Sequence, residues 1–191
     1  MARPSAEPIR RAAIVKATIQ EVGRAGSLEV TVAQIAGRAG VSSALAHHYF
    51  GSKEAIFVAA MRHVLTLFGA EVRGALATAQ DPRGRVEAIV RASFAAGSFR
   101  REAVGAWLNF YVLAQTMPEA RRLLRVYHAR LRSNLLHGLR PLVGDRARDV
   151  AEGLGALIDG VYLRQALTPG APDRAGATAL VLGHLAREVG P

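Results

Sequence analysis

Residues 31–53 read TVAQIAGRAGVSSALAHHYFGSK, and this stretch decides the fold. Thr31 is a good N-cap, and Gln34 follows three residues later, so the two side chains can form a capping box. Apolar residues then recur at helical spacing, and Gly40 supplies the positive φ that ends a short helix. Ser42 can cap a second helix. The pattern therefore predicts two short helices joined by a tight turn.

A further helix start follows directly. After Gly51, Ser52 can cap a helix whose first residue is Lys53. Two short helices around a glycine turn are typical of a helix-turn-helix motif, whose second helix lies in the major groove of DNA. A lysine at the next helix N-terminus, where backbone amides already favour an anion, suits a phosphate group. The working hypothesis is therefore DNA binding.

The composition is that of a globular chain. Of the 191 residues, 50% are hydrophobic and 21% are charged, so the chain can bury a core. The absence of cysteine excludes disulfides, thiolate metal sites and a cysteine nucleophile, and it fits a reducing compartment. No stretch approaches the ~20 apolar residues of a membrane span. We expect a cytoplasmic protein that is neither secreted nor inserted in a membrane.

The positive charge gives little help in locating a nucleic-acid site. The formal net charge is +10, but up to Arg62 there are eight Lys and Arg against four Asp and Glu, and the remaining residues carry seventeen against eleven. Because the excess is spread along the chain, the position of Lys53 is better evidence for DNA binding than the net charge. Arg10 and Arg11 lie near the start of the first predicted helix, where they either reach a phosphate backbone or form a solvated basic turn.

Helical patterns fill the chain, and no alternating run of β-branched residues predicts a strand. The fold class is therefore all-α. Beyond the helix-turn-helix, glycine and proline breaks separate the apolar repeats. The predicted helices outside the motif cover about residues 8–26, 52–79, 86–97, 102–116, 118–141, 144–167 and 173–189.

The segment 150–167 contains Gly153, Gly155 and Gly160 inside a helical pattern, although each glycine costs roughly 1 kcal/mol against alanine there. Small residues permit the close approach of another helix. Together with the apolar last helix, they predict a helix pair that packs on a symmetry mate as a four-helix dimer interface. The alternative is packing within one chain.

The motif residues resemble a known family. Ile35-Ala36, Ala39-Gly40-Val41-Ser42, His48-Tyr49-Phe50 and Ser52-Lys53-Glu54 are similar in type and spacing to the TetR family of bacterial repressors. The resemblance implies a three-helix DNA-binding domain, here residues 1–54, and a larger helical ligand-binding and dimerisation domain, here residues 55–191. It also implies release from DNA when a ligand binds, with no cofactor.

A second resemblance covers the rest of the chain. Pro8-Ile9-Arg10-Arg11, Met61-Arg62-His63, Arg130-Leu131 and Ala156-Leu157-Ile158-Asp159-Gly160 are similar to a choline-responsive branch of this family, which represses the genes that convert choline to glycine betaine. Tyr111 and Tyr162 stand where tryptophan is common in that branch, so the aromatic character is kept. The resemblance implies choline as the inducer; the alternative is a different small hydrophobic or cationic ligand.

The recognition helix presents its N-terminal residues to base edges. By the family pattern, Ala46 and Phe50 face the core, and Leu45 is then exposed. A leucine beside an alanine suits contact with thymine methyl groups better than hydrogen bonding. The residues available for base contacts are Ser42, Ser43, Ala44, Leu45, His47 and His48.

The remaining DNA contacts follow from the resemblance. His47 takes a position often filled by tyrosine, where it contacts a phosphate or a base. Tyr49 and Lys53 carry over as phosphate contacts, and Thr31 is a further candidate besides its capping role. Adjacent residues on a helix diverge by about 100°, so His47 and His48 cannot easily share a metal ion, and no metal site is predicted.

The ligand prediction also has a physical basis. A quaternary ammonium group donates no hydrogen bond, so a site for it needs aromatic faces and often a carboxylate. Trp107 and Tyr111 lie four residues apart on one helix face, and Asp159 and Tyr162 lie three apart on a later helix. Facing helices could assemble a cage from these groups together with Phe110. The alternative is that Trp107 and Phe110 fill the core and that Asp159 pairs with an arginine.

Other classes of protein fit the sequence less well. There is no HExxH, P-loop or G-x-S-x-G motif, and the spacing of Glu152, Asp159 and His184 does not indicate catalysis. A helical interaction protein without DNA binding would have no need of the capped motif that ends at Lys53. The sequence therefore predicts a non-enzymatic, homodimeric all-α repressor that binds double-stranded DNA at a pseudo-palindromic operator and responds to a small molecule, with choline as first choice.

Overall fold

The computed structural model describes residues 6–190, and over these residues it confirms the all-α prediction. No strand occurs among them. The helices are α1 (Ala6–Ala25), α2 (Val32–Ala39), α3 (Ser43–Phe50), α4 (Lys53–Thr78), α5 (Pro82–Ser93), α6 (Arg101–Thr116), α7 (Pro118–Val143), α8 (Ala147–Leu167) and α9 (Arg174–Val189), with a 3-10 turn, η1 (Gly144–Arg146), before α8.

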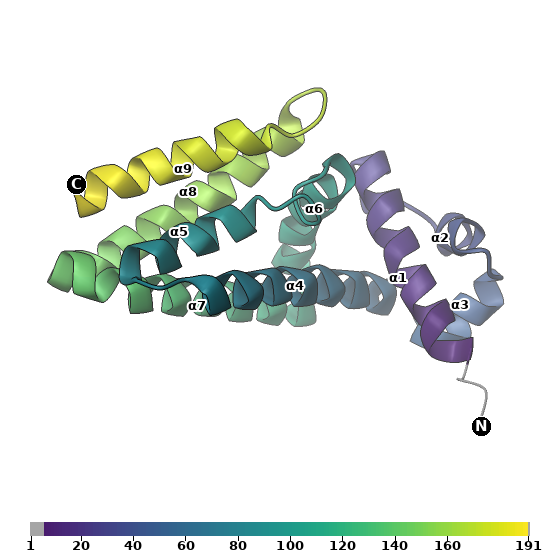
Figure 1. Cartoon of the computed structure of the whole chain (residues 1–191). Helices are drawn as coiled ribbons and strands as arrows, with labels where there is room; N and C mark the ends of the chain where they lie inside the picture. The colour runs from purple at the N-terminus through teal and green to yellow at the C-terminus, as the bar shows by residue number, and fades with distance from the viewer. Residues whose placement is uncertain (1–5, 191) are drawn as a thin grey trace.

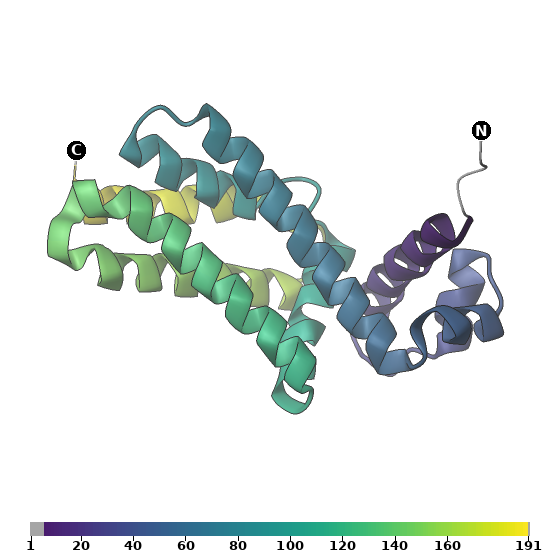
Figure 2. The same cartoon turned by 90° about the horizontal axis from the view of Figure 1, so that it is seen from below.

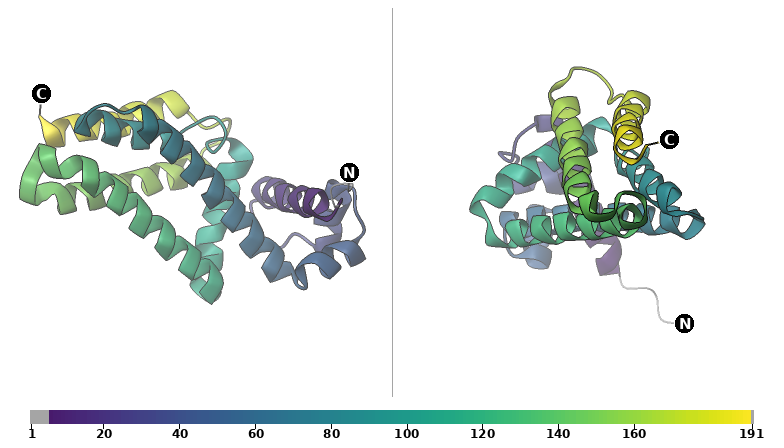
Figure 3. Two further views of the ribbon diagram at one scale, coloured as in Figure 1. Left: turned by 60° about the horizontal axis from the view of Figure 1, so that its bottom comes forward. Right: turned by 90° about the vertical axis from the view of Figure 1, so that its left-hand side faces the viewer.

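The chain forms a small N-terminal group of helices and a larger helical body. Helices α1, α2 and α3 lie together at one end, and α5, α7, α8 and α9 make up the far end (Figure 1). Helix α4 leaves the small group and runs along the larger body, as the view from below shows (Figure 2). Helices α8 and α9 pack side by side along one face (Figure 3).

The short helices of the N-terminal group are fixed by their caps. The Thr31 amide donates to Gln34 Oε1 at 2.7 Å, and the Gln34 amide donates to Thr31 Oγ1 at 3.2 Å, so the predicted capping box is present. Gly40 has a φ of 69° and ends α2. The Ser42 and Ser52 hydroxyls accept from backbone amides at the starts of α3 and α4, as predicted.

Some helix ends differ from the prediction. Helix α5 ends at Ser93 and not near Gly97, because the chain turns there: the Phe99 amide donates to the Ala95 carbonyl at 2.8 Å. This turn brings the buried rings of Phe94 and Phe99 edge to face at 5.0 Å. At the other end of the body, the α-helical part of α8 begins only after the 3-10 turn that follows Gly144.

Helix α1 contacts α6 at very short range. A Cβ atom placed on Gly23 of α1 would lie 2.1 Å from the Glu102 carbonyl oxygen of α6, and one placed on Gly105 would lie 3.0 Å from the Gly23 carbonyl oxygen. The two backbones therefore meet with no side chain between them. This contact joins the N-terminal group to a helix of the larger body.

One helix among the described residues, α4, is long and apolar enough to cross a membrane, with a mean hydropathy of 1.5 over its best window. The sequence-based expectation that no stretch approaches a membrane span was therefore too strict. Ile56, Phe57, Ala60 and Met61 of this helix are buried inside the protein. Since the central helix of a helical core passes the same test, length and composition alone are weak evidence for a membrane span.

The α1–α6 contact leads to a prediction about stability. Gly23→Ala should lower the free energy of unfolding by about 1–3 kcal/mol, because the added methyl group overlaps the α6 backbone. Gly74→Ala on α4 is the control, since nothing lies within 4 Å of a Cβ at that position and alanine favours a helix interior. Urea unfolding measures both variants. Equal stability of the two would contradict the close packing at Gly23.

Candidate functional site

Helix α3 presents a small exposed face. Ala46 is fully buried and Phe50 packs partly buried against the core, as the family pattern predicted. Leu45, which we expected to be exposed, is half-buried because it lies on the flank of α3 next to Ala46. Ser43 and Tyr49 are also half-buried. The exposed residues of the predicted set are Thr31, Ser42, Ala44, His47 and His48, and Lys53 is half-buried at the start of α4.

Basic side chains of the N-terminal group pack on aromatic rings. The Arg11 guanidinium lies 5.2 Å from the ring centre of Tyr49 and 5.1 Å from that of Phe50, and its Nε donates to Glu7 at 2.8 Å. Arg11 therefore fits neither of the two alternatives considered from sequence. Its guanidinium packs on rings of α3 and so connects α1 to the end of α3. The Lys53 ammonium similarly lies 5.4 Å from the Phe57 ring centre.

Four of the five predicted ligand residues come together. Trp107 and Tyr111 of α6 and Asp159 and Tyr162 of α8 line a cavity of about 290 Å³, which we call the α6–α8 cavity. The pairing of one helix face with another is the arrangement that the residue spacing predicted. Phe110 does not join them, since it is fully buried and is not among the lining residues.

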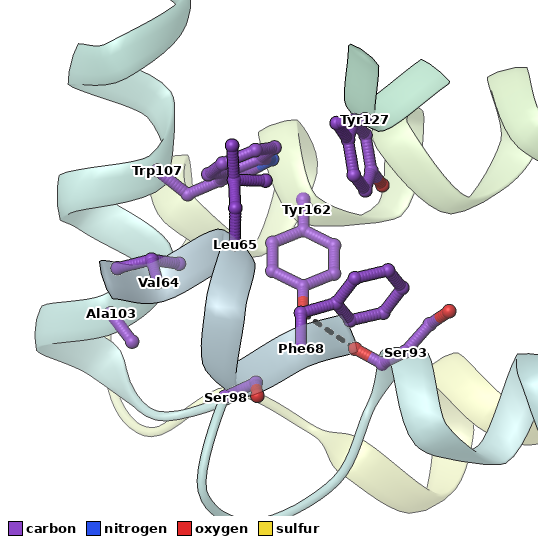
Figure 4. Close-up of a pocket in the computed structure, with 9 residues that line it drawn as sticks. All are labelled: Val64, Leu65, Phe68, Ser93, Ser98, Ala103, Trp107, Tyr127 and Tyr162. Carbon is purple, nitrogen blue, oxygen red and sulfur yellow. Dashed lines mark hydrogen bonds between the residues drawn. The ribbon is translucent and has the colours of Figure 1, made fainter. Parts of the chain in front are cut away.

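A second, small cavity of about 20 Å³ shares two lining residues with the first. These two residues are Trp107 and Tyr162. The Tyr162 hydroxyl donates to the Ser93 carbonyl, and Figure 4 shows this bond at the end of the ring. The lining residues of the small cavity are Val64, Leu65, Phe68, Ser93, Ser98, Ala103, Trp107, Tyr127 and Tyr162 (Figure 4).

Asp159 is surrounded by groups that the sequence did not reveal. The Tyr127 hydroxyl donates to Asp159 Oδ1 at 3.3 Å, and His128 Nε2 lies 3.2 Å from Asp159 Oδ2. The same His128 nitrogen lies 3.4 Å from the Tyr111 hydroxyl. Tyr127 also packs edge to face on Trp107 at 5.1 Å. The adjacent Tyr127 and His128 on α7 are the one feature of the sequence that could have indicated these contacts.

The phenols of the site are held neutral. Burial raises the pKa of Tyr111 and Tyr127, and the nearby Asp159 carboxylate raises both further. Burial and the Glu71 carboxylate raise the pKa of Tyr162. Within residues 6–190, no Lys or Arg lines either cavity. The site therefore offers aromatic faces, neutral hydroxyls and one carboxylate.

Possible metal-ligating side chains are not clustered in the described part of the chain. Among the described residues, no group of three or more His, Cys, Asp or Glu side chains is placed to hold a metal ion. Asp159 accepts a hydrogen bond from the Tyr127 phenol, which burial keeps protonated. The arrangement suits binding of a small cation.

Comparison with known proteins gives the family. A model of bacterial regulatory proteins of the tetR family matches residues 14–60, and a model of the C-terminal part of BetI-type transcriptional repressors matches residues 82–190. The chain therefore belongs to the TetR family of bacterial transcriptional regulators. Its C-terminal part is of the BetI type, and the family resemblance predicted from sequence is confirmed. Regulators of this family are DNA-binding proteins and not enzymes.

Individual relatives cover most of the chain. The HTH-type transcriptional regulator BetI of Brucella anthropi is 49% identical over 181 residues, which cover 94% of this chain and 93% of that protein. The protein of the same name from Rhizobium meliloti is 50% identical over 168 residues, which cover 87% of this chain and 83% of that protein.

Solved structures share the fold. A transcriptional regulator from Pseudomonas aeruginosa PAO1 has a TM-score of 0.79 at 27% identity, over 96% of this chain and 91% of that chain. A regulator from Saccharomonospora viridis in complex with choline has a TM-score of 0.82 at 22% identity, over 94% of this chain and 96% of that chain.

The raised tyrosine pKa values lead to a prediction about alkaline stability. A folded-state pKa above that of the unfolded chain gives stability that is complete below about pH 10 and is lost as the pH rises further. The free energy of unfolding should therefore fall above about pH 10. In Tyr162→Phe the fall should be smaller, since one phenol fewer ionises on unfolding. Denaturant titrations at several pH values measure this, and parallel curves for the two proteins would contradict it.

Proposed function

We propose that the protein represses the genes that convert choline to glycine betaine and that choline is its inducer. The observation that carries the proposal is the Asp159 carboxylate in a cavity walled by Trp107, Tyr111 and Tyr162. A quaternary ammonium group is attracted by aromatic faces and by a negative charge, and it needs no hydrogen-bond acceptor. The volume of about 290 Å³ suits a small molecule.

The relatives support the same assignment. Curated relatives at 49–50% identity carry the name BetI over most of the chain, and a solved structure with this fold holds choline. The alternative is a different small cationic or hydrophobic ligand, because apart from Asp159 the residues that line the cavity are largely apolar or aromatic. Asp159 favours the cationic ligand of the two.

The DNA-binding face belongs to the same proposal. Two protomers would place their α3 helices in successive major grooves of a pseudo-palindromic operator, ~34–36 Å apart or more. The exposed part of α3 is small, with Ala44 and two histidines, so phosphate contacts and duplex shape would carry much of the recognition. We assign base contacts to Ser42, Ser43, Ala44, Leu45, His47 and His48, and phosphate contacts to Thr31, Tyr49 and Lys53.

We further propose that α8 and α9 form the dimer interface. Leu163 and Leu167 of α8 and Leu180 of α9 are 47%, 70% and 49% exposed, which is unusual for leucine on helices that lie side by side. A four-helix contact with a second copy would cover them. The domain boundary would lie near residue 54, where α4 leaves the N-terminal group.

The path from ligand to DNA follows from the α6 contacts. Helix α6 carries Trp107 and Tyr111 against the cavity and Gly105 against α1. Helix α1 in turn carries Arg11 against the end of α3. A ligand that shifts α6 would move α1 and thus change the separation of the recognition helices, so that ligand binding lowers operator affinity. In a cytoplasmic regulator this coupling relieves repression.

Lys53→Ala should test the phosphate contact. Operator affinity should fall for all sequences alike, and the slope of log affinity against log salt should decrease by about one. His48→Ala on the exposed face of α3 should instead relax discrimination at particular base pairs. Fluorescence anisotropy with operator and scrambled duplexes over a salt series measures both, and identical behaviour of the two variants would mean that α3 is not the recognition helix.

Asp159→Asn should test the ligand site. Calorimetry should show choline binding to the unchanged protein and roughly tenfold or weaker binding to the variant, since a charge is lost from the cage. Asp149→Asn makes the same chemical change at an exposed position on α8 and should leave binding intact. If choline neither bound nor released the operator, the inducer assignment would be wrong while the family membership stood.

A further inference from the structure

In the ligand-free protein, the carboxylate of the site already has a partner that can carry positive charge. His128 Nε2 lies 3.2 Å from Asp159 Oδ2, a distance at which a protonated ring forms an ion pair. The His128 side chain is 45% exposed and that of Asp159 is 24% exposed, so one side of the His128 ring faces solvent while the other packs on the rings of Tyr127 and Tyr111. No other cationic side chain is paired with Asp159 among the described residues.

Asp159 lies between two hollows of the surface. It lines the α6–α8 cavity, and it also lines a polar groove of about 360 Å³ between α7 and α8, where His128 lies. A cation bound in the α6–α8 cavity and the His128 ring in the groove would thus share one carboxylate.

The surroundings of His128 leave Asp159 as its counter-charge. On α7, Arg125 and Arg132 line the same groove, and Arg132 pairs with Glu152 of α8 at 3.1 Å. From α6, the Tyr111 hydroxyl approaches the ring at 3.4 Å, and from α7 itself the Tyr127 hydroxyl binds Asp159. Because these phenols stay neutral, they do not change the charge of the site near neutral pH.

We propose that His128 is the resident partner of Asp159 with which a cationic ligand competes, and that His128 thereby sets the pH dependence of ligand binding. The proposal rests on the proposed function, since it concerns the same site. A protonated His128 neutralises the Asp159 charge and places a second positive charge near the ligand. The electrostatic attraction of the site for a cation is then small. A neutral His128 leaves the carboxylate charge available.

The direction of the effect follows from linkage. Histidine is the side chain that changes charge near neutral pH. If the cation binds the form with neutral His128, affinity falls as the pH decreases, by up to about tenfold per pH unit, and cation binding releases the His128 proton. A regulator with this pair would respond to its inducer less in an acidified cell.

The test is calorimetry with choline on the full chain between about pH 5.5 and pH 8. The unchanged protein should bind choline roughly tenfold more weakly at the acidic end, and binding there should release protons into the buffer. His128→Gln keeps a hydrogen-bond donor without a titratable charge, so its affinity for choline should vary much less with pH. His137→Gln, at an exposed position on the same helix, should behave like the unchanged protein.

Two outcomes separate this inference from the choice of inducer. If choline binds equally well at both ends of the pH range, or if His128→Gln keeps the full dependence, the role of His128 is refuted and the inducer stands. If choline does not bind at any pH, the inducer assignment fails, and tetramethylammonium becomes the probe. In that case NMR of the histidine rings should show His128 losing its proton when tetramethylammonium saturates the protein, and an unchanged His128 signal would overturn the inference.

Discussion

The rest of the structure depends on the contact between α1 and α6. Gly23 and Gly105 let the two backbones touch, so a displacement of α6 has no compressible side chain in which to be absorbed. Helix α6 also forms one wall of the ligand cavity through Trp107 and Tyr111. A single helix therefore borders both the cavity that we propose as the ligand site and the group of helices that contains α3.

Contacts between several helices also position α3 and the Asp159 carboxylate. At the DNA end, Arg11 packs on Tyr49 and Phe50, so the position of α3 depends on α1 as well as on the turn between α2 and α3. At the ligand end, Asp159 is held by side chains from α7 while it faces a cavity formed with α6. The exposed face of α3 and the α6–α8 cavity thus each depend on contacts with further helices.

Local signals were predictable from sequence, whereas the contacts that α7 makes with the other helices were not. The capping box at Thr31 and the pairing of Trp107 with Tyr111 depend on neighbours three or four residues away, so spacing was enough. Tyr127 and His128 were not predicted as site residues. Tyr127 is separated from Asp159 by 32 positions in the sequence, and its contact with Asp159 forms only when α7 packs on α8. Phe110 shows the converse: helical spacing placed an aromatic residue near the site without showing which side of α6 it occupies.

Trp107 is the only tryptophan of the chain, and it lines both the small cavity and the α6–α8 cavity with 5% of its surface exposed. All indole emission of the protein therefore originates at one wall of the proposed ligand site. Trp107 is therefore an intrinsic fluorescent probe, and its emission wavelength and intensity report the polarity of that wall without any label. The proposed occupancy of the cavity, and any displacement of α6 that accompanies it, can thus be followed in the unmodified protein, in real time and in the presence of DNA.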